Sequence, residues 1–448
     1  MARLFRIVTF RRLLIDDSEL GFFSEATKGE KVVRLSYIRY LCLRIELRNY
    51  NYPQCDEVES RDTKKWNNQI FTHSLKKLFQ VLCRWKPLDN RDTGLIFEIT
   101  AYSPGDIDCC PEASMEYDLH SKFQLEGDLT SQPSITEFMD TKEFRGMLML
   151  GKNWHRPRTM ERLQRLRGTT LKLSTKENPK PAPIVHTLWI RHQFHRGVGP
   201  RSLARLLCKT LVNVASLRLE VLSSLEEPQF QGQYDASEDI YPENPPNWNE
   251  FILVLPRHIQ HFSFNLFSRT QTGSEYLRTK ECLGEPRIGN RSKLTQLCLQ
   301  IGGDFSEDVL RFHQNDINRA VKISAVTVRS LPKFQILELW GCDGINTFMF
   351  RYELVKDHVT ITWRATEDWI TLEGENIQEW AKVAEGYNVG FSAKKEPFLR
   401  VTRGGMHIDG KIIYRHMKLC DLAMNPVTWL TLRQGEPGRA DGRTKGSG

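Results

Sequence analysis

The sequence predicts an α/β fold in which an irregular repeat array forms a curved, mostly parallel sheet with helices on its outer side. An apolar spacing typical of short strands recurs along the chain, and apolar residues at helical spacing lie between several of these copies. The composition, with 40% hydrophobic and 10% aromatic residues in 448, is that of a folded chain. We therefore expect one long body with a continuous core.

The repeat is an apolar residue followed by two more, three and five positions later. A single copy cannot bury its apolar face alone, whereas stacked copies can. The spacing is a degenerate form of the leucine-rich-repeat strand, L-x-x-L-x-L, and its irregular intervals predict a leucine-rich-repeat-like array with insertions. The six copies are Ile38/Leu41/Leu43, Val185/Leu188/Ile190, Val214/Leu217/Leu219, Ile259/Phe262/Phe264, Leu294/Leu297/Leu299 and Phe334/Leu337/Leu339.

The first elements alternate between strand and helix. Apolar and polar residues alternate over residues 40–47 and again over 95–99, as in half-buried strands. Between them, Leu75, Leu78 and Leu82 recur at helical spacing and predict an amphipathic helix over 72–85. The order strand, helix, strand is the order that a parallel sheet requires.

The later elements repeat this order. A strand is expected over residues 187–194, and Gly199 with Pro200 predicts a helix start whose buried stripe extends to Leu211. The next strand is expected to begin at Ser216. A further helix is predicted over 317–328, directly before a strand over 336–340.

The chain is expected to have three parts. We expect an N-terminal segment over 1–30, the repeat body over 31–434, and a disordered tail over 435–448, where glycine and polar residues dominate. Within the body, residues 223–250 are rich in acidic residues and proline, and they predict a long exposed loop.

Charge and cysteine usage favour the cytoplasm or the nucleus. The net charge of +8 is mild for this length and does not by itself require nucleic acid. The ten cysteines are scattered, and Cys42, Cys208 and Cys298 lie in apolar segments, as reduced cysteines do. Because no apolar stretch is long enough to cross a bilayer and the N-terminus lacks a secretory apolar core, no membrane partner is expected.

No catalytic motif accompanies the repeats. The sequence lacks G-x-x-x-x-G-K-[ST], G-x-S-x-G and H-E-x-x-H. Gly197 and Gly199 resemble the start of a dinucleotide fingerprint, but Ser202 replaces the third glycine, so a helix-start turn explains both. We therefore expect neither an enzyme nor a cofactor.

Metal binding is also not expected. Zinc requires about four convergent ligands. Only isolated close pairs occur, namely His192 with His195, His258 with His261, and Cys109 with Cys110.

Residues 152–180 form the most basic stretch and offer an alternative function. Lysine and arginine could neutralise phosphates there, and Trp154 could stack on a base, so the stretch could bind nucleic acid. Leu163 and Leu166 favour instead an ordinary helix with a solvated charged face. Nucleic acid is the less favoured partner.

Residues that flank the third apolar position of each copy should point away from the core and line the concave strand face. Aromatic residues and arginines in such a place are typical anchors of protein interfaces. The alternative is that insertions cover this strip, so that its tryptophans are core residues of a second layer. The candidate partner-binding residues are Trp189, Arg191, Arg218, Glu220, Asn265, Gln300, Glu338 and Trp340.

Six segments of the chain carry a resemblance to a known family: residues 37–47, 95–104, 335–340, 350–352, 360–364 and 414–419. Together they resemble a large group of filamentous-fungal F-box proteins. In that group an N-terminal F-box docks the Skp adaptor of a cullin ubiquitin ligase, and a leucine-rich-repeat-like body of unknown specificity recognises the substrate. The resemblance therefore implies substrate recognition, with ubiquitin transfer by other subunits.

One departure from this group concerns the F-box itself. It would be expected ahead of residues 10–13, and only nine residues precede that point. The chain is thus expected to be truncated or mis-started, or to bind its partner without the adaptor. The leading hypothesis is a non-enzymatic protein-interaction module, with the Skp adaptor and cullin as partners only where an F-box is present.

Overall fold

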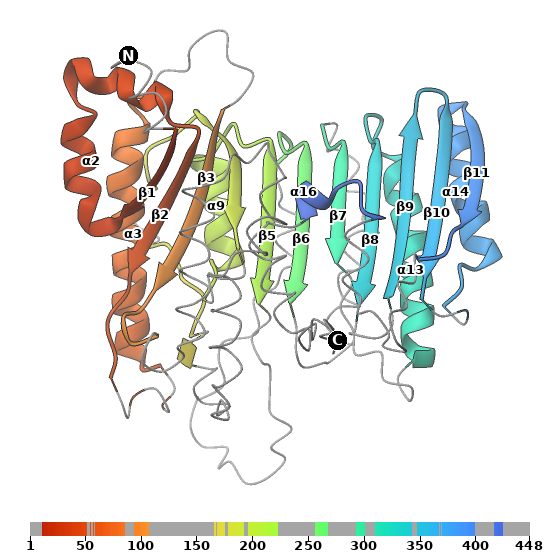
Figure 1. The fold of residues 1–448 in the computed structure, drawn as a ribbon, viewed down its shortest axis with the longest axis horizontal. Coiled ribbons are helices and arrows are strands. Elements are labelled where there is room, and N and C mark those ends of the chain that lie inside the picture. Colours follow the sequence, from red (N-terminus) through yellow and green to blue (C-terminus); the bar gives the residue numbers. More distant parts are fainter. Residues whose placement is uncertain are drawn as a thin grey trace, which may run out of the picture.

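The computed structural model contains one 11-stranded sheet, in which the strands lie side by side in the order of the sequence (Figure 1). The predicted α/β fold with a mostly parallel sheet is confirmed, and the sheet is open, with β1 and β11 at its edges. The residues that the structure describes are 11–51, 54, 57, 59–85, 94–106, 165–166, 168–174, 178–191, 196–222, 256–267, 293–300, 310–342, 347–366, 368, 370–398 and 416–423.

The first eight strands are parallel, whereas β9 runs antiparallel to both neighbours and β11 is again parallel to β10. Consecutive parallel strands need a crossover connection, which explains why strands and helices alternate. The strands are β1 (Arg12–Asp16), β2 (Tyr40–Glu46), β3 (Leu95–Tyr102), β4 (Val185–Ile190), β5 (Ser216–Leu222), β6 (His261–Phe267), β7 (Gln296–Gln300), β8 (Ile336–Cys342), β9 (Thr347–Val355), β10 (His358–Ala365) and β11 (Gly390–Lys395).

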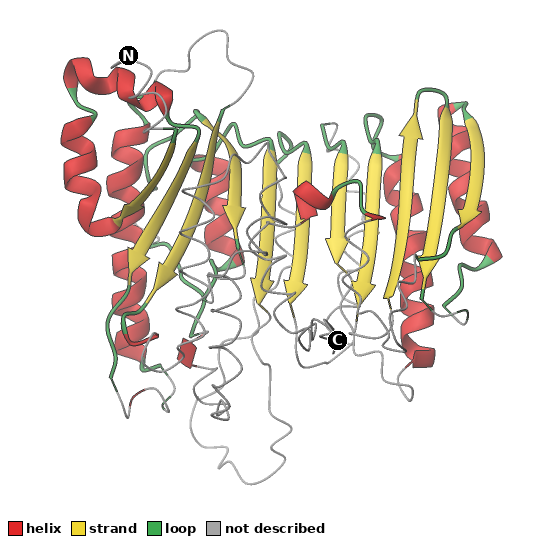
Figure 2. Ribbon diagram, viewed as in Figure 1, coloured by secondary structure: helices red, strands yellow, loops and turns green. Residues whose placement is uncertain are grey.

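Helices α3 (Arg61–Leu82), α9 (Pro200–Lys209), α13 (Leu310–Arg329) and α14 (Gly374–Tyr387) share a hydrophobic core with one face of the sheet (Figure 2). The four-residue helix α16 (Cys420–Ala423) lies on the opposite face. The remaining helices stand near the β1 end: α2 (Leu20–Ala26) and the 3-10 helices η1 (Asp17–Glu19) and η2 (Gly29–Tyr37).

Two helix starts were predicted from the sequence, and the structure confirms one of them and places the other earlier. The predicted start of α9 is confirmed, because Gly199 is its N-cap and Pro200 occupies the first turn. Helix α3 begins earlier than the predicted 72–85, since the Ser60 hydroxyl accepts a hydrogen bond of 3.2 Å from the Thr63 amide and caps it. The apolar spacing begins only where α3 reaches the core.

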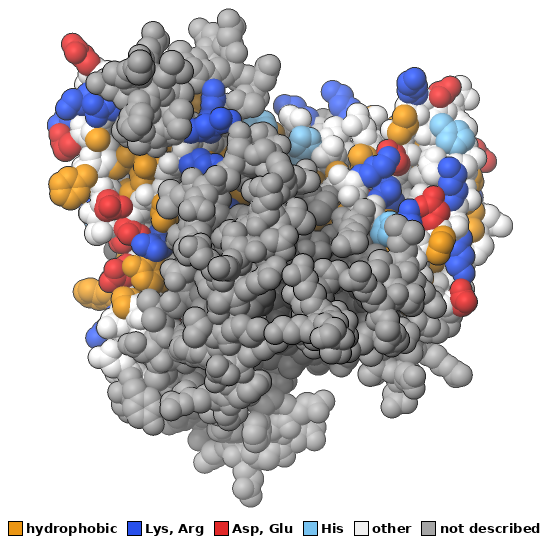
Figure 3. Space-filling view, in the orientation of Figure 1, with side chains coloured by type: hydrophobic (Ala, Val, Ile, Leu, Met, Phe, Trp, Pro, Cys, Tyr) orange, Lys and Arg blue, Asp and Glu red, His pale blue; other side chains and the backbone are white. Residues whose placement is uncertain are grey.

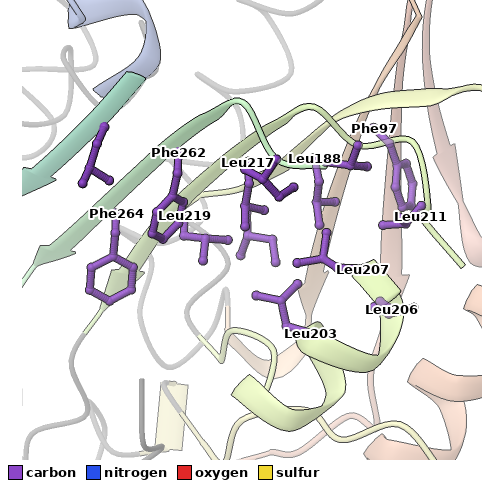
Figure 4. Close-up of a cluster of buried hydrophobic side chains, with 14 of the residues drawn as sticks. Phe97, Leu188, Leu203, Leu206, Leu207, Leu211, Leu217, Leu219, Phe262 and Phe264 are labelled. Carbon is purple, nitrogen blue, oxygen red and sulfur yellow. The ribbon is translucent and has the colours of Figure 1, made fainter. Parts of the chain in front are cut away.

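All six predicted repeat copies lie in register in the sheet. Their middle residues join one apolar row that crosses every strand, and each of the six is buried. Figure 4 shows the leucines of α9 against the part of this row on β4, β5 and β6. The row comprises Leu13, Leu41, Phe97, Leu188, Leu217, Phe262, Leu297, Leu337, Tyr352, Ile361 and Ala393.

The segment expected to stand apart at 1–30 contributes strand β1, which pairs with β2 in the sheet. The acidic stretch 223–250 and the tail 435–448 lie outside the described residues. No helix among the described residues has the length and apolarity needed to cross a membrane.

Candidate functional site

A second row of residues crosses the sheet beside the apolar row, on the face opposite α9, α13 and α14. We call this the second face. Because successive residues of a strand point to opposite sides, the residues next to the core residues along each strand define this face. The row comprises Leu14, Cys42, Glu98, Trp189, Arg218, Ser263, Cys298, Glu338, Arg351, Thr362 and Lys394.

A buried ion pair joins Glu98 of β3 to Arg191, which follows β4. Their side chains are 1% and 4% exposed, and Arg191 Nη2 lies 2.7 Å from Glu98 Oε2. The same oxygen accepts a 2.5 Å hydrogen bond from the Tyr40 hydroxyl, and Arg191 Nη2 lies 3.3 Å from that hydroxyl. Charge-assisted bonds of this kind fix side-chain geometry.

The ionisation of these groups follows from their burial. Desolvation, followed by the charge of Glu98, raises the pKa of the Tyr40 phenol and of the Cys42 thiol well above their usual values. Desolvation lowers the pKa of Arg191, but Glu98, Tyr40 and Glu220 outweigh it, so the pKa of Arg191 rises. Tyr40 and Cys42 stay protonated at neutral pH, and Cys42 therefore does not serve as a thiolate nucleophile.

Trp189 of β4 lies between two guanidinium groups. The Cζ atoms of Arg191 and Arg218 lie 5.1 and 4.6 Å from its ring centroid, and Tyr40 meets it edge-on at 6.0 Å. Cation–π contacts of this length are favourable when desolvated. Among the described residues, the indole Nε1 and the Arg191 atoms Nε and Nη1 have no hydrogen-bond partner.

A second buried ion pair lies near the other end of the sheet. Glu338 of β8 and Arg351 of β9 are in-register neighbours, and Arg351 Nε lies 2.6 Å from Glu338 Oε1. The Glu338 carboxylate also accepts hydrogen bonds of 2.9 Å from the backbone amides of Lys418 and Leu419. Arg351 donates to the carbonyl oxygen of His416. The pair thus holds residues 416–419 by their main chain.

A small apolar cluster surrounds this ion pair on the second face. Trp340 of β8, 1% exposed, packs with Cys298 of β7 and Met349 of β9. Met417, Leu419 and Leu422 belong to the same cluster and come from residues 416–423. Trp340 is therefore a core residue of a second layer, as one of the two sequence interpretations expected.

The predicted strip is brought onto one face of neighbouring strands, but most of it is buried. Arg218 of β5 and Gln300 of β7 are half-buried, and the side chain of Asn265 lies outside what the structure describes. The burial of these side chains agrees with the interpretation in which the strip is covered. The buried members are Trp189, Arg191, Glu220, Glu338 and Trp340.

Sequence reasoning missed Tyr40, Glu98 and Arg351, which complete the two ion-paired clusters. The available signal was a charged residue between apolar residues of the same strand, since Glu98 lies between Phe97 and Ile99. A charge at such a position on a covered face requires a partner. Its partner could not be inferred, because Arg191 is far from Glu98 in the sequence and lies just after β4.

The other candidate motifs gain little from the structure. No group of three or more possible metal ligands occurs among the described residues, and two of the predicted pairs, His192 with His195 and Cys109 with Cys110, lie outside them. Most of the basic stretch 152–180 also lies outside them. Its described Arg165 is buried over the ring of Tyr50, at 4.4 Å, so nucleic-acid binding by this stretch stays a prediction.

The exposed surface at the β9–β11 end carries both charge signs. Figure 3, which looks onto the second face, shows basic and acidic side chains intermixed there. Three ion pairs account for part of this mixture: Arg364 with Glu396, Lys395 with Asp368, and Lys418 with Glu353. Because nucleic acid favours a surface of one sign, this region suits a polar protein surface better.

Comparison with known proteins gives one match. A family of unknown function (DUF6546) matches residues 274–424, about a third of the chain. No curated protein and no solved structure matches. The matched range contains β7 to β11 and ends one residue after α16, so it includes both the strands around Glu338 and the segment bound to them.

Proposed function

We propose that this chain is a non-enzymatic protein-interaction module that recognises its partner through the second face of the sheet. In this proposal it resembles the substrate-recognition part of a fungal F-box protein and works in the cytoplasm or nucleus. The supporting observation is the in-register row on the second face, in which Glu98, Trp189 and Arg218 are neighbours on parallel strands at the regular strand spacing of about 4.8 Å.

Two features of that row favour recognition over catalysis. The Glu98 and Glu338 carboxylates are engaged by arginines and hydrogen-bond donors, so neither is poised for proton transfer. Arg218 of the row, on β5, is half-buried, as is Gln300 of β7, which lies on the same face, so part of each side chain is exposed to solvent. Rigid anchors beside accessible polar groups are typical of interfaces.

The test is site-specific crosslinking. A photo-crosslinking amino acid replaces Arg218 on the second face in one variant and Val326, exposed at 48% on α13, in a matched control. After irradiation in an extract, the crosslinked chain is identified by mass spectrometry. A defined partner captured from position 218 and absent from position 326 would support the proposal, whereas identical patterns from both positions would refute it.

The ubiquitin-ligase part of the proposal needs a separate measurement. The purified chain is mixed with the Skp adaptor and cullin, and the mixture is separated by size-exclusion chromatography. Co-elution supports a role as a ligase subunit. Separate elution removes that role and leaves partner recognition to the crosslinking test.

A further inference from the structure

Residues 416–423 lie across the second face, far from their contacts in sequence. The amide of Leu419 and the carboxylate of Glu338 are 81 positions apart. Figure 1 shows α16 in front of β6 and β7, and the contacts of α16 with both strands agree with this view. We call residues 416–423 the cover segment.

Three main-chain groups of the cover segment form hydrogen bonds with the Glu338–Arg351 pair. Glu338 accepts from the amides of Lys418 and Leu419, and Arg351 donates to the carbonyl of His416. Main-chain amides and carbonyls are common to every peptide. The ion pair therefore recognises a backbone conformation and leaves the side-chain sequence to other contacts.

The apolar side chains of the cover segment supply those other contacts. Met417, Leu419 and Leu422 pack with Trp340 and its neighbours, which gives the spacing apolar-x-apolar-x-x-apolar. The outward-facing Lys418 contributes an ion pair with Glu353, but its side chain is 49% exposed, and exposed pairs contribute little. Selectivity at this site thus rests mainly on the buried apolar side chains of the segment, which also include Ala423.

The two charged groups under the cover segment are already paired with each other. Glu338 and Arg351 are in-register neighbours of an antiparallel strand pair and neutralise each other at 2.6 Å. Removal of the segment would expose a paired carboxylate and guanidinium, which water can solvate, and would not leave an isolated buried charge. A short segment held in this way can be exchanged for another peptide.

We propose that the cover segment is an internal ligand of a peptide-binding site on β7, β8 and β9, and that a partner peptide displaces it. This inference rests on the proposed function and names the partner class: a short peptide with the same apolar spacing and two adjacent free amides over Glu338. The match to the unknown-function family spans the strands of the site and the cover segment together.

The test uses the full chain with the cover segment released by Leu419→Asp and Leu422→Asp. The probe is a fluorescein-labelled synthetic peptide of residues 414–424, and binding is measured by fluorescence anisotropy. A tethered segment competes at an effective concentration that can reach about millimolar, so the released variant should bind at least about tenfold more tightly than the unmodified chain. Equal affinity for both chains, or no binding to either, would overturn the inference.

Two controls distinguish a specific peptide-binding site from nonspecific binding to an apolar surface. The same peptide N-methylated at the Leu419 amide loses one donor to a charged acceptor and should bind about tenfold or more weakly. Glu338→Met with Arg351→Leu replaces the ion pair by apolar side chains, a change that folded proteins commonly tolerate. It removes the acceptor and the donor for the main chain of the peptide, so binding should also weaken about tenfold or more. Unchanged affinity in either control would contradict the proposal.

The folded state of the released variant is itself an outcome. The released variant should have the same circular dichroism spectrum as the unmodified chain and should unfold cooperatively in urea. Loss of cooperative unfolding would show that the cover segment belongs to the core. If peptide binding is absent while the crosslink from position 218 persists, this inference fails and the proposed function stands. The reverse result removes recognition through Arg218 and retains the peptide site.

Discussion

Removing the charge of Glu98 should destabilise the protein strongly, because Arg191 would lose the carboxylate that lies 2.7 Å away and its own side chain is only 4% exposed. Glu98→Gln preserves the shape of the side chain and leaves an acceptor for the Tyr40 hydroxyl. The loss is therefore mainly that of the ion pair. Breaking one side of a buried pair costs about 3–5 kcal/mol.

The assay is urea unfolding followed by circular dichroism. With a slope of about 3 kcal/mol per molar urea, that cost lowers the unfolding midpoint by about 1 to 1.7 M. The matched control is Glu25→Gln, which breaks the exposed pair between Glu25 and Lys28 and should leave the midpoint unchanged.

A double variant distinguishes charge burial from a general loss of packing. Glu98→Met with Arg191→Met removes both charges, and it should recover most of the stability that the single substitution loses. A midpoint shift below about 0.3 M for Glu98→Gln would refute the reasoning. So would a double variant that is less stable than the single one.

Three further predictions concern the core, the alkaline range and the basic stretch. Leu217→Ala truncates a fully buried member of the apolar row and should lower the free energy of urea unfolding by about 2–5 kcal/mol. Val326→Ala, at an exposed position of α13, should change it little. Similar effects of the two substitutions would contradict the burial of Leu217 in the row. Because burial raises the pKa of Tyr40, its contribution to stability is complete below the unfolded tyrosine pKa of about 10 and is lost as the pH rises above that value. Tyr40→Phe should therefore reduce the fall of the urea midpoint between pH 9 and pH 11. An unchanged fall would contradict this. If residues 152–180 bind nucleic acid, filter binding should weaken steeply between 50 and 200 mM salt, and absent or salt-insensitive binding would end that alternative.

Six of the parallel strands, β2 and β4 to β8, could be predicted because each carries the same apolar spacing. The spacing places Leu188, Leu217 and Phe262 at equivalent positions, and the structure has them in register. The parallel direction of these strands followed from the alternation of strands and helices. Sequence reasoning was therefore sufficient wherever one repeat unit determined one strand.

The antiparallel hairpin of β9 and β10 was not predicted, because the sequence of its turn is unusual. Strands β9 and β10 alternate apolar and polar residues, but the residues between them are Lys356 and Asp357, without the glycine that usually marks a tight hairpin. Lys356 adopts a φ of 54°, a conformation rare for lysine. The sequence signal for this hairpin was therefore weak.

The candidate site could be predicted only in part. Alternation along β4 and β8 placed Trp189, Glu338 and Trp340 on one face, and they lie on that face. Their burial depends on contacts between segments far apart in sequence, such as that of Glu338 with the amides of Lys418 and Leu419. No local pattern encodes such a contact.

The most direct test of the account asks whether distant strands lie side by side on the second face. His261 of β6 and Gln296 of β7 are half-buried in-register partners, so their side chains should be separated by about 4.8 Å. Thr360 of β10 belongs to the same row but lies four strands from β6, at about 19 Å. A short thiol-bridging reagent should join His261→Cys to Gln296→Cys and should not join His261→Cys to Thr360→Cys, as read by mass spectrometry of the digested chain. Bridging of the distant pair, or failure of the near pair, would contradict the single sheet on which the proposed recognition face depends.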